Sequence, residues 1–259
     1  TLDPDDLTGE LLLSFAATPR TRLFGGVSRG FRPPNIFDLG TLGERPGNRF
    51  NIANTDLAPE TIVTYEAGLK WLGDKVAGEF VVFSANYDDR IVSVATGDLT
   101  DDGRTVVQSQ NVAEAEFVGA EAGFRYQPSP GIELAISLSW IEGDEIRADG
   151  TEQPADRVPP LNGQVSGRFA IGDRWSVEPL VRFAGRQDRL SARDIGDPRI
   201  DPDGTPGWAR VDLRAVYARN DAWSLSIGIE NLFDKAYREH GSGVDAPGFN
   251  AVLRVDARF

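Results

Sequence analysis

The sequence predicts an all-β protein and, more narrowly, an antiparallel up-and-down transmembrane β-barrel. Three observations support this prediction. Apolar and polar residues alternate with a period of two along most strand candidates, which is typical of strands with two different faces. Short turns alternate with long polar loops, and aromatic residues gather at strand ends. Together these features match a barrel that turns apolar side chains to lipid and polar side chains to a lumen.

Composition sets the broad limits. The chain has 259 residues, 40% of them apolar, which is enough for one large all-β domain. Its net charge of -13 would repel a phosphate backbone and excludes nucleic acid as a general partner. Because cysteine is absent, disulfides and thiolate metal sites are excluded. The sequence begins at Thr1 and has no methionine, so we expect a mature or excised segment.

In the first half of the chain, strands are predicted where the alternation is cleanest. They are Glu10–Ala17, Arg22–Arg29, Thr61–Trp71, Val76–Val94 and Phe117–Tyr126. Residues 30–59 are rich in Gly, Pro and Asn and are predicted to be irregular. The acidic stretch 97–104 is predicted to be a loop, and the segment up to Asn111 could extend that hairpin.

The second half contains six further strand candidates. They are Ile132–Trp140, Leu161–Ile171, Trp175–Gln187, Trp208–Ala218, Trp223–Ile229 and Ala251–Phe259. Pro179 cannot donate to a sheet ladder, so we expect a bulge at that position. The long polar segments 143–160, 188–207 and 231–248 alternate with short turns, as extracellular loops alternate with periplasmic turns in outer-membrane barrels.

Aromatic residues at strand ends predict two belts at the membrane interfaces. Those at the short-turn ends are Trp71, Tyr126, Trp175, Tyr217, Trp223 and Phe259, and those at the long-loop ends are Trp140 and Trp208. Charges on the polar face are predicted to form ladders on the lumen wall. These residues are Glu66, Lys70, Glu121, Arg125, Arg210, Asp212, Arg214, Arg254, Asp256 and Arg258.

The number of strands carries a further inference. About eleven strands is an odd number, whereas bacterial single-chain barrels have even numbers. The chain is therefore predicted to be part of a larger barrel, and about 22 strands is the natural total.

Several segments resemble the sequence boxes of TonB-dependent outer-membrane receptors. SRGFRPPNIFDL (28–39) resembles the FRAP-type box, and NTDLAPETIVTYEAGLKW (54–71) is similar to the NPDLxPE box. NVAEAEFVGAEAGF (111–124), RVPPLNG (157–163) and the terminal IENLFDKAYREHGSG…APGFNAVLRVDARF resemble later boxes in the same order. Phe249 stands where an arginine is usual in the family's PGR element.

The resemblance implies the carboxy-terminal part of the β-barrel over residues 1–259, with the plug and the amino-terminal strands absent from these residues. It implies a bacterial outer-membrane location and a lipid environment. For the intact protein it implies capture of a scarce ligand such as an iron chelate, haem, cobalamin or a saccharide. Uptake would be driven by TonB, ExbB and ExbD acting through the plug. A ferric siderophore is the expected ligand.

The ligand-facing candidates lie on and beside the loop at residues 30–59. They are Arg29, Arg32, Arg45, Arg49, Phe50 and Asn51. Arginines beside an aromatic residue in an acidic protein suit an anionic chelate. Bonds to neighbouring loops or to lipid phosphates are the alternative reading of the same residues.

No catalytic constellation is visible, and no enzyme activity, resident cofactor or metal site is predicted. The single histidine, His240, has no second histidine or cysteine beside which to bind a transition metal, and it is predicted to be a solvated loop residue. Asp101, Asp102, Asp201 and Asp203 lack the spacing of a calcium loop and are expected to be solvated.

Two other functions stay open at this point. A passive porin-like outer-membrane channel would share the barrel and lack the plug. A soluble or adhesive β-sheet domain would bury the apolar faces of its strands and expose the charged ones.

Overall fold

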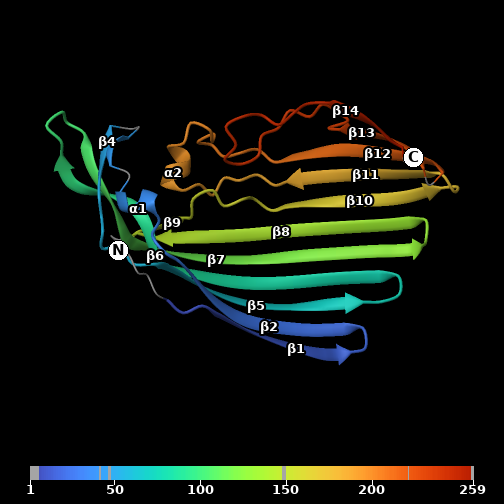
Figure 1. Cartoon of the computed structure of the whole chain (residues 1–259), viewed down its shortest axis with the longest axis horizontal. Coiled ribbons are helices and arrows are strands. Elements are labelled where there is room, and N and C mark those ends of the chain that lie inside the picture. The colour runs from blue at the N-terminus through green and yellow to red at the C-terminus, as the bar shows by residue number, and fades with distance from the viewer. Residues whose placement is uncertain (1–5, 41, 46–47, 148–149, 221, 258–259) are drawn as a thin grey trace.

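The computed structural model describes residues 6–40, 42–45, 48–147, 150–220 and 222–257. These residues form one large, curved sheet (Figure 1). Eleven strands follow one another along it in chain order, each antiparallel to the next. Within the described residues no helix combines the length and the apolar character needed to cross a membrane.

The strands on this path confirm the predicted ones. Several are longer than predicted, whereas the strand that begins at Trp175 ends at Ala184 rather than at the predicted Gln187. The strands of the path are β1 (Gly9–Thr18), β2 (Thr21–Arg32), β5 (Glu60–Leu72), β6 (Val76–Leu99), β7 (Thr105–Ser129), β8 (Ile132–Ile146), β10 (Asn162–Ile171), β11 (Trp175–Ala184), β12 (Trp208–Asn220), β13 (Trp223–Glu230) and β14 (Asn250–Ala257). Arg258 and Phe259 lie outside the described residues.

The long segments contain structure that the sequence did not predict. Residues 30–59 include a short helix α1 (Ile36–Gly40) and the strands β3 (Gly43–Arg45) and β4 (Arg49–Ile52). The segment 143–160 includes β9 (Glu152–Pro154), and 188–207 includes α2 (Ala192–Ile195). Periodicity cannot reveal elements this short, because three or four residues do not complete a repeat.

Two other expectations need correction. The loop predicted at 97–104 is shorter than expected, because β6 continues to Leu99 and only residues 100–104 form the turn, and the segment up to Asn111 extends the β6–β7 hairpin. Pro179 produces no bulge, because β11 keeps one register with β12 from Trp175 to Ala184. On the other side, the pairs at Ser166 and Phe169 also share one register, so the missing donor interrupts the ladder without shifting it.

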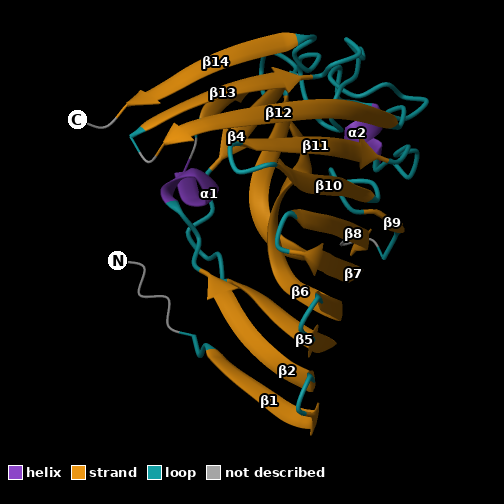
Figure 2. Cartoon of the chain, turned by 90° about the vertical axis from the view of Figure 1, so that its right-hand side faces the viewer, coloured by secondary structure: helices purple, strands orange, loops and turns teal. Residues whose placement is uncertain are grey.

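The short turns and the long loops lie at opposite ends of the sheet. Figure 1 shows the turns after β1, β5, β7 and β10 at one end and α1, β4, β9 and α2 at the other. Figure 2 shows the sheet bending through an arc from β1 to β14, with α1 on the hollow side. We call the hollow side the inner face and the other side the outer face.

The register assigns side chains to the two faces as predicted. Tyr217, Leu225 and Val255 are directly opposite one another on β12, β13 and β14, and the same row continues to Trp175. Ile227 and Leu253 are 42% and 66% exposed, so this face is not the dry centre of a sandwich. The neighbouring row holds Ser226 and Arg254. Because opposite residues share a face, the apolar and ionic rows stay separate across the sheet.

Charged residues of the inner face pair across strands. Glu178 on β11 lies between Arg168 of β10, at 2.8 Å, and Arg214 of β12, at 3.5 Å. Lys70 and Glu79 lie 3.5 Å apart across β5 and β6. No charged residue predicted to face the lumen shares the row of Leu225 and Ile227, among those that the structure describes. The predicted face of these residues is therefore confirmed. The predicted ladders are confirmed only in part, because Lys70, Arg125 and Arg214 pair across strands, whereas Arg210 and Arg254 pair with a carboxylate of their own strand.

Most of the predicted interface aromatics lie on the outer face. Trp71, Tyr126, Trp175, Tyr217 and Trp223 lie there near the short turns, and Trp175 stacks on Tyr217 with ring centroids 4.9 Å apart. Trp140 lies on the same face towards the loops.

Trp208 was predicted to belong to the aromatic belt at the loop ends, but the structure places it on the inner face. It shares the inner-face row of β12 with Arg210 and Asp212, opposite Ala184. Its ring packs on Tyr237 of the loop 231–249, with centroids 4.2 Å apart. A tryptophan at a strand end can therefore lie on either face. It lies on the inner face when its position differs by an even number of residues from that of an inner-face charged residue on the same strand, as for Trp208 and Arg210.

Phenylalanine rings of the inner face lie over glycines on the next strand. A side chain at Gly119 would overlap the ring of Phe83, and one at Gly68 or Gly143 would overlap Phe24 or Phe117. The rings therefore lie flat against the wall, and glycine is required where each ring lies.

We expect Gly119→Ala to destabilise the sheet by about 1–3 kcal/mol, as overpacking does. The new methyl group would lie 2.8 Å from the carbonyl oxygen of Trp140 and closer still to Phe83. Gly228→Ala is the matched control, because it is on the same face and nothing lies within 4 Å of the position that its new methyl group would take. Urea titration, followed by heat-modifiable migration in detergent, measures both variants. Equal midpoints would contradict the packing described for Phe83.

Candidate functional site

The candidate site is the loop end of the inner face, where the segments singled out in the sequence converge. Much of the buried apolar surface also lies here, including Leu57, Val107 and Ala115. Loops that approach one another without a large core must satisfy their backbone groups with polar side chains. The buried polar residues show how this is done.

Glu60, the first residue of β5, organises the first cluster. Its carboxylate is 5% exposed and accepts from the Arg32 guanidinium, from the Tyr87 hydroxyl at 2.9 Å and from the Ile91 amide at 2.7 Å. Arg32 also donates to Asp38 of α1 at 2.7 Å. Glu60 thereby joins β2, β5, β6 and α1.

The electrostatics of Glu60 follow from these contacts. Burial by itself would raise the pKa of the carboxyl group, but the hydrogen bonds from Arg32, Ile91 and Tyr87 outweigh it. The pKa of Glu60 is consequently lower than its ordinary value, and the residue stays ionised. The same carboxylate raises the pKa of the Arg32 guanidinium.

Asn111 of β7 holds the end of the same loop. Its amide oxygen accepts from the Ala58 amide at 2.9 Å, and its amide nitrogen donates to the carbonyl oxygens of Ala58 and Asp89 at 2.9 and 2.7 Å. Asp89 has a positive φ of 56°, at a register shift between β6 and β7. The side chain of Asn111 thus fixes a bulge and a loop together.

The β3–β4 hairpin brings two of the predicted ligand-facing arginines together. Arg45 and Arg49 are directly opposite each other, and Asn51 lies on the same side of β4 as Arg49. Phe50 lies on the other side, opposite Glu44, which pairs with Arg104 at 2.9 Å. β4 also pairs in parallel with residues 105–108 of β7. The hairpin is therefore attached to the sheet through β7, beside the path of eleven strands.

Arg29 and Arg32 are placed differently from the other candidates. Arg29 lies in the outer-face row opposite Val63 and pairs with Asp6 at 2.6 Å, so it points away from the hollow side. Arg32 lies on the inner face, where Glu60 and Asp38 engage it. Arg45, Arg49 and Asn51 thus share one side of the β3–β4 hairpin, and Phe50 lies on the other side.

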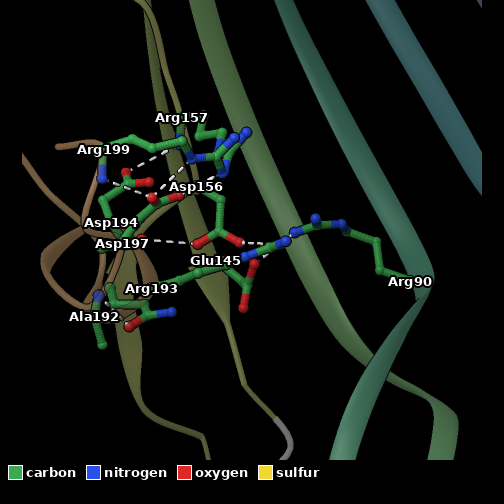
Figure 3. Close-up of polar contacts among 11 residues, drawn as sticks. Arg90, Glu145, Asp156, Arg157, Ala192, Arg193, Asp194, Asp197 and Arg199 are labelled. Carbon is green, nitrogen blue, oxygen red and sulfur yellow. Dashed lines mark hydrogen bonds and ion pairs between the residues drawn. The ribbon is translucent and has the colours of Figure 1, made fainter. Parts of the chain in front are cut away.

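A second cluster ties the loops 147–161 and 185–207. Arg157 donates from its side chain to Asp197 at 2.6 Å and from its backbone to Asp194 at 3.0 Å. Asp156 accepts from Arg193 at 2.9 Å and from Ser191, the N-cap of α2. Figure 3 shows Asp156, Arg157, Arg193, Asp194 and Asp197 together.

Arg90 forms an ion pair at the same end of the sheet. It extends from β6 across β7 to Glu145 of β8 (Figure 3), and their closest atoms are 2.7 Å apart. Glu145 is buried, so the pair fixes the wall between the two clusters.

His240 differs from the solvated loop residue that the sequence predicts. Its Nδ1 lies 2.9 Å from the Thr205 hydroxyl, and its Nε2 is buried without a partner among the described residues. Burial lowers the pKa of His240, Asp194 partly opposes this shift and Arg157 adds to it. The imidazole is thus a neutral packing residue between two loops. No group of three or more His, Asp or Glu among the described residues could hold a metal.

The loop that carries His240 is fixed by Asn231. Asn231 is fully buried, donates to the carbonyl oxygens of Lys235 and Pro247 and receives the Lys235 amide. Its own amide donates to Asp212 at 2.8 Å.

Sequence reasoning missed the fixing roles of Glu60, Asn111, Asp194 and Asn231. Three of these residues lie inside the quoted boxes, and each box begins or ends near a strand end. The position of a polar residue in such a box, close to a strand end, was the sequence feature that could have revealed these roles. Asp194 lies in no box, and its partner Arg157 belongs to a separate loop.

Comparison with known proteins gives one family match and several distant relatives. Residues 1–232 match the family described as "TonB dependent receptor-like, beta-barrel". The iron-regulated outer membrane virulence protein of Vibrio cholerae is 26% identical over 227 residues, covering 84% of this chain and 34% of that protein. The ferric enterobactin receptor of Pseudomonas aeruginosa is 24% identical, over 94% of this chain and 36% of its own length.

A solved structure extends the likeness in fold. The copper transporter OprC superposes with a TM-score of 0.78 at 23% identity, over 97% of this chain and 39% of that one. The chain thus spans about a third of the length of the two relatives (34% and 36%).

We expect Glu60→Gln to loosen the loop 33–59. The neutral amide would lose the charge-assisted bond to Arg32, at a cost of about 1.5–3 kcal/mol. Faster amide hydrogen exchange in residues 35–58 measures the effect. Glu66→Gln, on the same strand and face, is the control and should leave that exchange unchanged. If both variants exchange alike, Glu60 does not hold this loop.

Acid should have the same effect on the unmodified protein. Because the folded-state pKa of Glu60 lies below its ordinary value of 4.5, its contribution to stability is complete above pH 4.5. The contribution is lost as the pH falls through the folded-state pKa. The protection of residues 35–58, which compares their exchange rate with the intrinsic rate at the same pH, should therefore fall more steeply with acid in the unmodified protein than in Glu60→Gln. Parallel pH profiles would argue against this linkage.

Proposed function

The chain belongs to the family of TonB-dependent receptor-like β-barrels, and from that premise we propose that the intact protein captures a ferric chelate at the cell surface for energised uptake. The fold and the outer-membrane relatives place the chain in the bacterial outer membrane. The family is one of transport receptors, and the proposed role involves no catalysis.

The observation that carries the proposal is the combination of a charged inner wall with fixed loops at one end. The inner-face ladders of Glu178 and Lys70 suit a water-filled interior, whereas the outer face suits lipid. The two relatives compared above are named for iron regulation and for ferric enterobactin, which supports iron as the element carried.

We also propose that further strands and a plug complete the receptor. β1 and β14 are the two ends of the strand path and do not pair with each other in the described residues. An open barrel edge in lipid would leave backbone groups unsatisfied, so additional strands are required. Coupling to TonB, ExbB and ExbD would then act through the plug.

Uptake measurements separate this proposal from a passive channel. We expect cells that carry the protein to accumulate radioactive iron from a ferric catecholate, and deletion of its gene to reduce that accumulation. Removal of TonB should have the same effect as the deletion, since the transport is energised. Uptake that depends on the gene but not on TonB would favour the porin-like alternative.

The β3–β4 hairpin supplies a second test. We expect the double variant Arg45→Ala, Arg49→Ala to weaken ferric catecholate binding by about tenfold or more, because arginine pairs with anionic oxygens through charge-assisted bonds. Arg238→Ala, in another loop, is the control. Isothermal titration with the purified intact protein measures the affinity. Unchanged affinity of the double variant would remove this hairpin from the ligand site.

A further inference from the structure

The β6–β7 hairpin continues past the end of β5, and this leaves one edge of β6 open. β5 pairs with β6 only as far as Asp88, whereas β6 continues to Leu99. Pro59, just before β5, has no amide hydrogen and cannot continue the ladder. The chain before it contacts β7 instead, where Asn111 holds Ala58. The part of β6 beyond Asp88 is therefore paired with a strand on one side only.

The direction of the backbone groups at this edge follows from the alternation of an antiparallel ladder. The Ile91 amide donates to a side chain of β5 rather than to β7, so Ile91 turns its backbone groups to the open side. Ser93 and Ala95, two and four residues further on, turn theirs to the same side. Opposite Ser93, the Ser109 carbonyl oxygen accepts from the Asn54 side chain, so this pair does not exchange bonds either.

These edge groups have no partner among the described residues. No other segment bonds to the amides or carbonyl oxygens of Ser93 and Ala95. Both residues are exposed and have small side chains, so their backbone is accessible. Natural edge strands usually carry lysine, proline or a bulge that prevents another strand from pairing. Residues 91–95 carry none of these.

The rest of the proposed receptor leaves this edge accessible. Figure 1 shows the tip of the hairpin, in green, projecting from the loop end of the sheet. The strands proposed to complete the barrel join beyond β1, four positions from β6. At about 4.8 Å between strands, they lie about 19 Å from the edge. The edge groups point along the sheet rather than towards the hollow side, so the proposed plug does not cover them.

The charges beside the open edge define its partner. Asp88 and Asp89 lie at one end and Asp98 at the other, and none of the three forms an ion pair with a described residue. The basic residues nearby, Arg90 and Arg104, are engaged in ion pairs of their own. Two copies of this edge would bring like charges together, which disfavours a second copy. In a chain of net charge -13, the edge therefore suits a cationic strand.

We propose that the open edge of β6 binds an extended cationic peptide segment of a partner protein by strand addition. The segment pairs with the backbone of Ser93 and Ala95 and places its basic side chains near Asp98 and Asp89. Backbone bonds supply the affinity, and the carboxylates select for positive charge. The inference goes beyond the proposed function, because it involves no transported cargo.

The test uses the synthetic peptide KTVTVTVK, which has a strand-forming centre and basic ends. Two comparison peptides, ETVTVTVE and KTVPPTVK, reverse the end charges or remove two adjacent amide donors. Added to the intact protein in detergent, only KTVTVTVK should slow the amide exchange of residues 92–96, by about fivefold or more at saturation. Fluorescence anisotropy of the labelled peptides gives their affinities.

Variants of the edge separate backbone pairing from charge. Ser93→Pro removes an edge donor without removing a bond to β7, and it should weaken binding of KTVTVTVK by about tenfold. Ser93→Ala keeps the amide and is the matched control, with affinity within about twofold of the unmodified protein. Asp98→Asn should weaken binding by about two- to fivefold at low salt. Asp173→Asn, in the short turn between β10 and β11, is its control and should have no effect.

Heat-modifiable migration verifies that each variant is folded, and the comparison peptides test the unmodified protein directly. Equal binding of KTVPPTVK would overturn strand addition, and equal binding of ETVTVTVE would overturn the cationic partner. Slow exchange at Ser93 and Ala95 before any peptide is added would also overturn the proposal, because another segment or a second copy would then occupy the edge. Iron uptake and its dependence on TonB are measured separately, so the proposed function stands or fails on its own.

Discussion

The structure depends on one constraint, namely that a strand in a membrane must satisfy all its backbone groups in the sheet while its side chains face two incompatible solvents. Because successive side chains of a strand point to opposite faces, the position of a residue in the hydrogen-bonded ladder fixes the face on which its side chain lies. The separation of Leu225 and Val255 from Ser226 and Arg254 follows from it. Even Pro179, which breaks one bond of the ladder, leaves the register intact.

Beyond the level of the membrane the same strands are organised by a different interaction. There the β6–β7 hairpin and the loops have no lipid to cover them, and the apolar residues that they bury, such as Leu57 and Val107, form no large core. Ionised or amide side chains such as Glu60, Asn111 and Asn231 hold them by collecting several backbone and side-chain donors each. These bonds are directional, so they fix loop geometry more strictly than apolar contacts would. The proposed receptor function requires such fixed loops, because the groups of a ligand must be met at defined positions.

The two proposed contact regions lie on the two edges of the β6–β7 hairpin. The β3–β4 hairpin presents Arg45 and Arg49 from a loop that adds to the edge of β7. The edge of β6 stays open beyond Asp88 and has carboxylates at both ends. The two edges thus carry opposite charge, so an anionic chelate and a cationic peptide would be bound at separate places.

The sequence by itself determined the class of fold, the strand path and the face of nearly every strand residue, because a period of two is a local property that survives any tertiary arrangement. It also marked the boxes that contain Glu60, Asn111 and Asn231. Only the tertiary structure decided what those residues do, since Glu60 gathers donors from β2 and β6, and Asp194 bonds a loop 37 residues away. Trp208 shows the same limit: its position at a strand end was visible in the sequence, but its partner Tyr237 comes from another loop. Which residues of distant segments come into contact depends on the register of the whole sheet, and no local sequence pattern encodes that register.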